Sequence, residues 1–133
     1  MKARAVEFVD LLIPGSFLVA KSWLSADCEY VYLDKVLKGD AIIESFEVNH
    51  ENAAKRLDRI LYLRGEVEEV IGQSVSVLVT DQIWSGKRMH VYQDRLIVTL
   101  EERSGKTLVT RIENRRVEGE REKLMKFYEA CGI

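Results

Sequence analysis

The segment SVSVLVTDQIWSGKRMHVYQDRLIVTLEERSGKTLVTRIENR, residues 74–115, alternates between apolar and polar side chains over most of its length. A period of two is typical of strands with one buried face, because successive side chains point to opposite sides of a sheet. The pairs Ser85-Gly86 and Ser104-Gly105 interrupt this pattern, and such pairs favour tight turns. The segment therefore predicts three long strands, which lie at Ser74–Trp84, Lys87–Glu102 and Lys106–Arg115.

A fourth strand is predicted just before this segment, at Leu63–Ile71, and the turn signal Gly72-Gln73 separates the two. Short turns join antiparallel neighbours, so the second half of the chain is expected to form a meander of long strands. Nearer the N-terminus, Cys28–Leu33 is rich in strand-forming residues and predicts one more strand.

Helical spacing marks the remaining segments. A first helix is expected to end at Pro14-Gly15, and Ser16 is suited to cap a short second helix. A third is predicted from Ala41, behind Asp40 as its N-cap, with a break near Asn49-His50. The apolar residues that define the first and the last helix are Val6, Phe8, Val9 and Leu12, and Leu124, Phe127, Tyr128 and Cys131. Helices first, strands next and a helix last predict an α+β domain.

Composition and charge exclude several classes of protein. The 133 residues are 47% hydrophobic and 32% charged, which predicts a single packed domain over residues 1–133. The formal net charge is −2, and the arginines between Arg111 and Arg121 alternate with glutamates, so we expect no nucleic-acid partner. No apolar run could span a bilayer, and the first residues mix both charges. We therefore expect no signal peptide, no membrane and a cytoplasmic setting.

Few residues are available to bind a metal. The two cysteines, Cys28 and Cys131, lie near opposite ends of the chain, and the histidines are His50 and His90. This spacing matches no zinc motif and no disulfide framework. We therefore expect neither a metal nor a cofactor, and we expect His50 to occupy a helix end or a cavity rim.

Two stretches carry a resemblance to a known family. Trp23-Leu24-Ser25-Ala26-Asp27-Cys28-Glu29-Tyr30 resembles the passage from second helix to first strand in the nuclear-transport-factor-2-like, or SnoaL-like, superfamily. Lys38-Gly39-Asp40-Ala41-Ile42-Ile43-Glu44-Ser45-Phe46 is similar to the glycine-led entry into the third helix of that superfamily. Gly105-Lys106 opens the last strand as it does there, and the resemblance covers residues 5 to 115.

The resemblance implies a curved antiparallel sheet wrapped around N-terminal helices into a cone, often dimeric through the outer sheet face. The predicted C-terminal helix, from Glu118 onward, is an addition to the common pattern. Members include ketosteroid isomerases, limonene-epoxide hydrolases, scytalone dehydratase and many non-catalytic binding proteins. Membership therefore locates a cavity without assigning its use.

The working positions of these enzymes are only partly matched. The general-base aspartate of the isomerases aligns with Tyr32 and their oxyanion-binding tyrosine with Phe8, so both roles are lost. Their protonated aspartic acid aligns with Asp94 when one residue is allowed to slip. The arginine of the epoxide hydrolases aligns with Tyr92, whereas the water-positioning tyrosine of scytalone dehydratase aligns with Tyr32.

If Asp94 faces the interior of the cone, alternation along the strands defines the rest of a lining. The expected inner residues are His90, Tyr92, Asp94, Leu96 and Val98, then Cys28, Tyr30 and Tyr32, and finally Leu108, Thr110, Ile112 and Asn114. This lining suits a small hydrophobic molecule with one or two oxygens. We expect that molecule to contact Tyr30, Tyr92, Thr110, Ile112 and Asn114.

Catalytic roles follow from the side-chain chemistry. Burial would raise the pKa of Asp94 and make it a hydrogen-bond donor or general acid. His90, on the same predicted face, could act as a base, and Tyr32 could donate to a substrate carbonyl. The function expected is isomerase-like or dehydratase-like acid–base chemistry on a hydrophobic carbonyl or hydroxyl compound.

Two alternatives stay open. In the first, the protein is a non-catalytic ligand-binding or protein-interaction module that forms a homodimer through the outer sheet face, using Met89, Val91 and Ile97. In the second, the interior is structural, and Asp94 only accepts hydrogen bonds from the neighbouring tyrosines. Tyr62 is expected at a solvated strand edge in each case.

Overall fold

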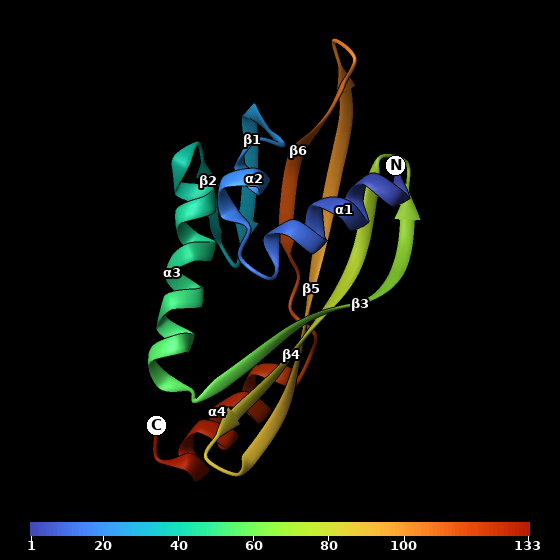
Figure 1. The fold of residues 1–133 in the computed structure, drawn as a ribbon. Coiled ribbons are helices and arrows are strands. Elements are labelled where there is room, and N and C mark those ends of the chain that lie inside the picture. The colour runs from blue at the N-terminus through green and yellow to red at the C-terminus, as the bar shows by residue number, and fades with distance from the viewer.

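The computed structural model describes residues 1–133 and has an α+β architecture (Figure 1). The helices are α1 (Lys2–Leu12), α2 (Phe17–Lys21), α3 (Asp40–Arg56) and α4 (Glu120–Cys131). The strands are β1 (Leu24–Tyr32), β2 (Lys35–Lys38), β3 (Arg59–Ile71), β4 (Ser74–Ser85), β5 (Arg88–Arg103) and β6 (Lys106–Asn114). No helix combines the length and the apolar character that crossing a membrane requires.

All six strands form one sheet in the order β2-β1-β6-β5-β4-β3. Four of the neighbouring pairs are antiparallel, and β1 lies parallel to β6. The sheet was expected to be antiparallel throughout, but β1 and β6 are far apart in sequence and no short turn fixes their relative direction. β2 was not predicted, because only four residues form this edge strand.

The long strands curve around the helices to form a cone (Figure 1). Helix α1 crosses one face of the sheet, α3 stands beside β1 and β2, and α4 lies at the opposite end from the N-terminus. The α+β class, the cone and the additional C-terminal helix are therefore as predicted.

The pairing of β4 with β5 organises the interior. Twelve residue pairs run without a bulge from Ser74↔Thr99 to Ser85↔Arg88, so the same face stays inward over the whole length. In its first half that face carries fully buried residues such as Val75, Val77 and Val98. These pack with α1 in the main core, which includes Phe8, Val9 and Leu12.

Two predicted helix features differ from the structure. Helix α3 continues through Asn49-His50 to Arg56, because that pair contains neither proline nor glycine to interrupt it. Gly39, with φ of 62°, occupies the N-cap position in place of Asp40. The Asp40 carboxylate instead forms an ion pair with Lys21, with Nζ 2.8 Å from Oδ1.

A β-bulge in β6 changes which of its residues face inward. Thr99 pairs with Arg111 and Leu100 pairs with Val109, so Thr110 is the extra residue. Val109 and Ile112 are both fully buried although they lie three positions apart. Leu108 and Thr110 are therefore displaced from the inner face on which strict alternation had placed them.

Gly65 marks the irregular part of β3, where the register with β4 shifts between Arg64 and Val67. A Cβ at Gly65 would lie 2.9 Å from both the Cβ and the carbonyl oxygen of Leu78. We expect Gly65→Ala to lower the free energy of unfolding by about 1–3 kcal/mol, because backbone must move to make room. The exposed neighbour provides the control: Glu66→Ala should change it by less than about 0.5 kcal/mol. Urea denaturation measures both, and equal effects would contradict this explanation of the glycine.

Candidate functional site

A cavity of about 290 Å³ lies beyond the part of the sheet that α1 covers. Its wall is formed by the inner face of the sheet, by α3 and by α4. The residues in this wall from the sheet are Tyr30, Tyr32, Tyr62, Val79, Asp81, Tyr92, Asp94, Leu96 and Asn114. Apolar and polar groups therefore converge on one small space, as is typical of ligand sites.

Two carboxyl groups face this cavity from adjacent strands. Asp94 lies opposite Val79 and Asp81 lies opposite Tyr92, so the aspartates are diagonal neighbours on one face, with Cβ atoms somewhat less than about 7–8 Å apart. Asp94 is held at both oxygens: Oδ2 accepts from Nδ2 of Asn114 and Oδ1 from its neighbour's backbone N–H, each at 2.9 Å. Asp81 accepts no hydrogen bond from the protein.

Because only Asp94 accepts hydrogen bonds, the two carboxyl groups have different pKa values. Burial, reinforced by the charge of Asp94, raises the pKa of Asp81 to about 7. Burial also raises the pKa of Asp94, but the hydrogen bond from Asn114 and the charge of Arg116 oppose that shift. Asp94 is thus the carboxyl that ionises first, while Asp81 exchanges its proton near neutrality.

Tyrosine hydroxyls flank the carboxyl pair. Tyr62 and Tyr92 stand on either side of Asp81 across the sheet, and burial raises the pKa of each phenol to about 12. Tyr30 is stacked on Phe46 at 4.7 Å, and burial raises its pKa as well. These three phenols stay protonated at neutral pH and can donate hydrogen bonds to a bound oxygen.

Tyr32, a predicted catalytic residue, also lines the cavity. Nη2 of Arg116 donates to its hydroxyl at 2.8 Å, and the guanidinium carbon lies 5.5 Å from its ring centre. Arg116 follows β6 directly and was not predicted as part of the site. A guanidinium in this position can stabilise negative charge on a ligand oxygen.

His50 of α3 is part of the cavity wall. This position is compatible with the predicted place at a cavity rim. Its ring is stacked on Tyr62 at 4.4 Å and meets Phe17 edge-on at 4.9 Å. Burial lowers its pKa, so the imidazole is neutral at pH 7 and one ring nitrogen is an acceptor. Tyr62 itself is half-buried and lies opposite Asp81, whereas we had expected a solvated edge.

The structure does not bring His90 to this cavity. His90 shares the inner face of β5 with Tyr92 and Asp94, but α4 covers that end of the strand. Its ring is stacked on Phe127 at 5.2 Å, and Nε2 is buried without a hydrogen-bond partner. His90 therefore lies outside the lining of the cavity for which it was predicted as a base.

Two predicted ligand contacts lie elsewhere too. Thr110 is the extra residue of the β6 bulge, and its hydroxyl donates to the carbonyl oxygen of Thr99 at 3.4 Å. Ile112 faces inward but is fully buried in the main core. The predicted residues that the structure does bring together are Tyr30, Tyr32, Tyr92, Asp94 and Asn114.

Sequence reasoning missed several lining residues. Alternation from Val75 through Val77 and Val79 would have reached Asp81, because β4 has no bulge against β5. Arg56 of α3 and the α4 residues Arg121 and Tyr128 gave no comparable signal. Their positions depend on how helices pack on the sheet, which strand periodicity does not contain. No group of three His, Cys, Asp or Glu side chains is arranged to hold a metal ion.

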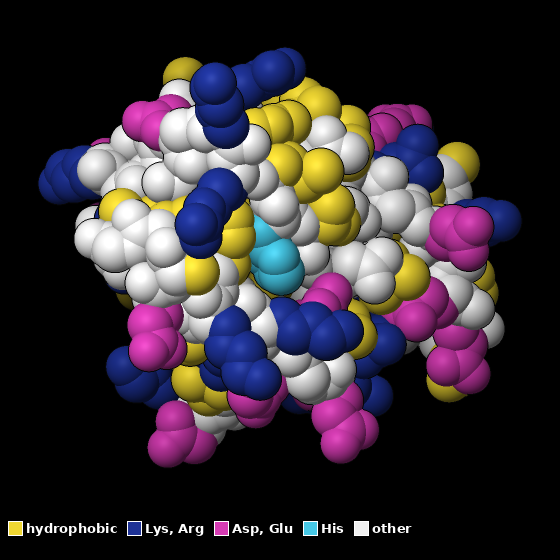
Figure 2. Space-filling view, turned by 90° about the horizontal axis from the view of Figure 1, so that it is seen from below, with side chains coloured by type: hydrophobic (Ala, Val, Ile, Leu, Met, Phe, Trp, Pro, Cys, Tyr) yellow, Lys and Arg dark blue, Asp and Glu magenta, His cyan; other side chains and the backbone are white.

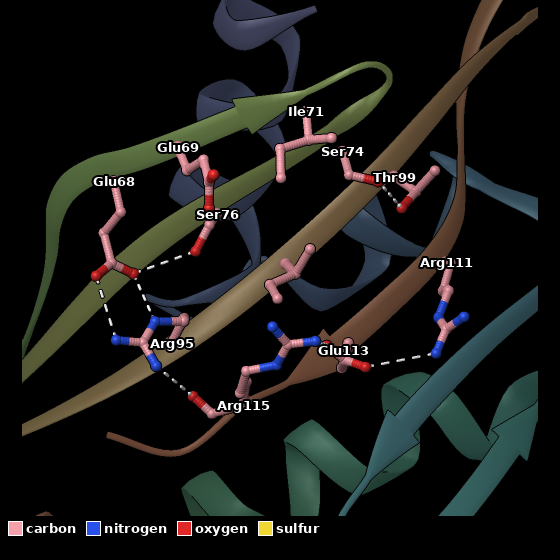
Figure 3. Close-up of a pocket in the computed structure, with 11 residues that line it drawn as sticks. Glu68, Glu69, Ile71, Ser74, Ser76, Arg95, Thr99, Arg111, Glu113 and Arg115 are labelled. Atoms are coloured by element: carbon pink, nitrogen blue, oxygen red, sulfur yellow. Dashed lines mark hydrogen bonds and ion pairs between the residues drawn. The ribbon is translucent and has the colours of Figure 1, made fainter. Parts of the chain in front are cut away.

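A larger, charged hollow of about 680 Å³ lies on the opposite face of the sheet (Figure 3). Its side chains pair with one another across β3, β4, β5 and β6. Nε of Arg95 lies 2.5 Å from Glu68, whose carboxylate also accepts from Ser76 at 3.1 Å. Ile71 and Ile97 are its only hydrophobic side chains, so this hollow is a polar surface on which most charged side chains form ion pairs.

Comparison with solved structures identifies the type of fold. No family model matches the sequence, and no curated protein matches it. Among solved structures, an NTF2-like protein with a cystatin-like fold from Novosphingobium aromaticivorans is 16% identical, with a TM-score of 0.66 over 92% of this chain and 85% of the other. The chain therefore has the nuclear-transport-factor-2-like cone fold that the sequence resemblance implied.

Two further structures show how widely this fold is used. The epoxide hydrolase/cyclase-like enzyme SalBIII, which has a role in pyran ring formation in the polyether salinomycin, is 14% identical, with a TM-score of 0.61 over 87% of this chain and 89% of the other. The association domain of Caenorhabditis elegans CaMKII is 10% identical, with a TM-score of 0.62 over 84% and 90%. At such identities the similarity establishes the fold and leaves the activity open.

Asp81 is expected to make folding pH-dependent. Because its folded pKa of about 7 lies above the ordinary aspartate value of 3.8, the folded protein retains a proton that the unfolded chain releases between these values. Stability contributed by this group is therefore lost as pH rises from about 4 to about 7, by roughly 2–4 kcal/mol. Asp81→Asn should remove most of this loss, so the variant should exceed the wild type in stability above pH 7. Urea denaturation at several pH values measures the effect, and parallel profiles for the two proteins would rule out the raised pKa.

Proposed function

We propose that the cone cavity binds a small hydrophobic molecule bearing a carbonyl or hydroxyl group, and that Asp81 and Asp94 perform acid–base chemistry on it. The observation that carries this proposal is that two carboxyl groups with different pKa values face one partly apolar cavity. Environments that push the pKa values of neighbouring carboxyls apart are the usual means of giving them different roles.

Each group has a defined task in this proposal. Asp81 transfers the proton, because its pKa of about 7 lets it act in both directions near neutral pH. Asp94 remains the ionised partner, positioned by Asn114. Tyr32, polarised by Arg116, donates to the substrate oxygen and stabilises charge that develops there. Asp81 thus replaces His90 in the scheme expected from the sequence.

Removal of a proton next to a carbonyl group provides a test. With 1-tetralone as the probe in D₂O, the wild type should catalyse α-proton exchange at a rate that rises through about pH 7 as Asp81 deprotonates. Asp81→Asn should reduce that rate by a factor of about 10²–10⁴. NMR follows the exchange directly.

Asp34→Asn is the matched control, because Asp34 is exposed in the β1–β2 turn, outside the cavity. It should leave the exchange rate unchanged. An equal rate for wild type and Asp81→Asn would contradict acid–base catalysis by this pair and leave ligand binding without turnover.

Self-association is a second proposal, carried by a different surface. Exposed apolar side chains gather on the outer face of β3 and β5: Leu61, Leu63, Met89 and Val91 are 38–50% exposed. Leu61 and Val91 both pair with Gln82, so they lie in one row across the sheet. Exposed apolar patches of this kind mark contact surfaces, so we propose a homodimer through this face. The similarity to an association domain supports self-association.

The double variant Leu61→Glu/Val91→Glu tests the dimer. It places like charges in the middle of the proposed contact and should shift the protein to monomers in analytical ultracentrifugation. The exposed-surface control Leu33→Glu, at the β1–β2 turn, should sediment like the wild type. A wild type that is monomeric at high micromolar concentration would refute this proposal.

A further inference from the structure

Three arginine side chains line the cavity without a carboxylate partner. They are Arg56 at the end of α3, Arg116 after β6 and Arg121 in the first turn of α4. Six other arginines have a carboxylate oxygen within 4 Å. Three chain segments therefore bring unpaired guanidinium groups to one cavity, while most arginines elsewhere are paired.

Aromatic rings hold two of these guanidinium groups in place. The guanidinium carbon of Arg56 lies 4.3 Å from the centre of the Tyr128 ring, and that of Arg116 lies 5.5 Å from the Tyr32 ring. A guanidinium over a ring keeps its in-plane N–H groups free, and these match the two oxygens of a carboxylate. Arg121 makes no hydrogen bond to the protein and is exposed, so its donors are free as well.

The balance of charge in the cavity favours an anion. Its wall holds three arginines against the two aspartates, and Asp81 keeps its proton up to about pH 7. The wall is thus positive on a chain whose formal net charge is −2. Of these three arginines, Arg116 is the one whose charge acts on Asp94, which leaves Arg56 and Arg121 without an opposing charge.

The same end of the molecule is shown in Figure 2, which looks from the side of α4. A histidine side chain lies in the middle of this face beside exposed hydrophobic side chains, with Lys and Arg side chains around it, and most Asp and Glu side chains lie towards the rim. A ligand with a negative group and a hydrophobic body fits this distribution of side chains.

We propose that the ligand of the cone is a hydrophobic monocarboxylic acid, whose carboxylate is bound by Arg56 and Arg121 while its body extends towards Asp81 and Asp94. This inference rests on the proposed binding function and adds the chemical class of the ligand. A single negative charge is preferred, since a doubly charged phosphate would be repelled more strongly by ionised Asp94.

A matched pair of probes tests the inference. Isothermal titration calorimetry with 3-phenylpropanoate and 3-phenylpropanamide compares a carboxylate with a neutral group of nearly equal shape. The wild type should bind the carboxylate about tenfold more tightly than the amide, as charge-assisted hydrogen bonds predict. Arg56→Gln/Arg121→Gln should abolish this preference without weakening amide binding.

Arg59→Gln is the control, because Arg59 is also stacked on an aromatic ring, Trp84 at 4.5 Å, but lies outside the cavity. It should keep the preference for the carboxylate.

Equal binding of the two probes by the wild type overturns the carboxylate assignment and leaves the cavity as a binding site for neutral molecules. The carboxylate assignment is also overturned if the double variant still prefers the carboxylate. If the wild type binds neither probe at millimolar concentration, both this inference and the proposed binding function are overturned. Arg121→Gln alone, which removes no hydrogen bond within the protein, should reduce the preference and separates loss of binding from loss of folding.

Discussion

The unbroken pairing of β4 with β5 is the constraint on which the structure depends. Twelve consecutive pairs keep one face inward from Ser74 to Ser85. Where α1 covers that face, the inward residues are valines and leucines that form the core, and beyond α1 the same face presents Asp81, Tyr92 and Asp94. The core and the cavity are thus lined by side chains of the same inward face of β4 and β5. A shift of the strand register by one residue would turn all of these side chains to the outer face.

The same alternation explains how much of the molecule could be predicted from its sequence. It locates the long strands, and with the inward direction that the family resemblance implies for Asp94 it places Tyr92 and Asn114 on a common face with Tyr30 and Tyr32. Thr110 is displaced by a one-residue bulge that leaves no mark in the pattern. His90 has the predicted direction but is covered by α4, and the arginines come from segments outside the strands, so these features depend on tertiary packing.

The cavity has a cost for the stability of the fold. Asp81 is surrounded by protein without accepting a hydrogen bond from it, and burial of its charged form opposes folding at neutral pH. Asparagine at this position would avoid the charge, and an aliphatic residue would extend the core formed by Val75, Val77 and Val79. A carboxyl in such a place is the arrangement expected where proton transfer is needed. Helix α4 packs against β5 at this end and supplies Arg121.

The proton affinity of Asp81 is the quantity on which the catalytic role rests. Its side-chain carboxyl carbon can be followed by NMR in the isotope-labelled protein from acid to alkaline pH. We expect a midpoint of about 7, and a lower midpoint in Asp94→Asn, where the neighbouring negative charge is absent. A midpoint close to 4, unchanged in that variant, would show that Asp81 is an ordinary solvated carboxyl and would contradict the separation of roles between the two aspartates.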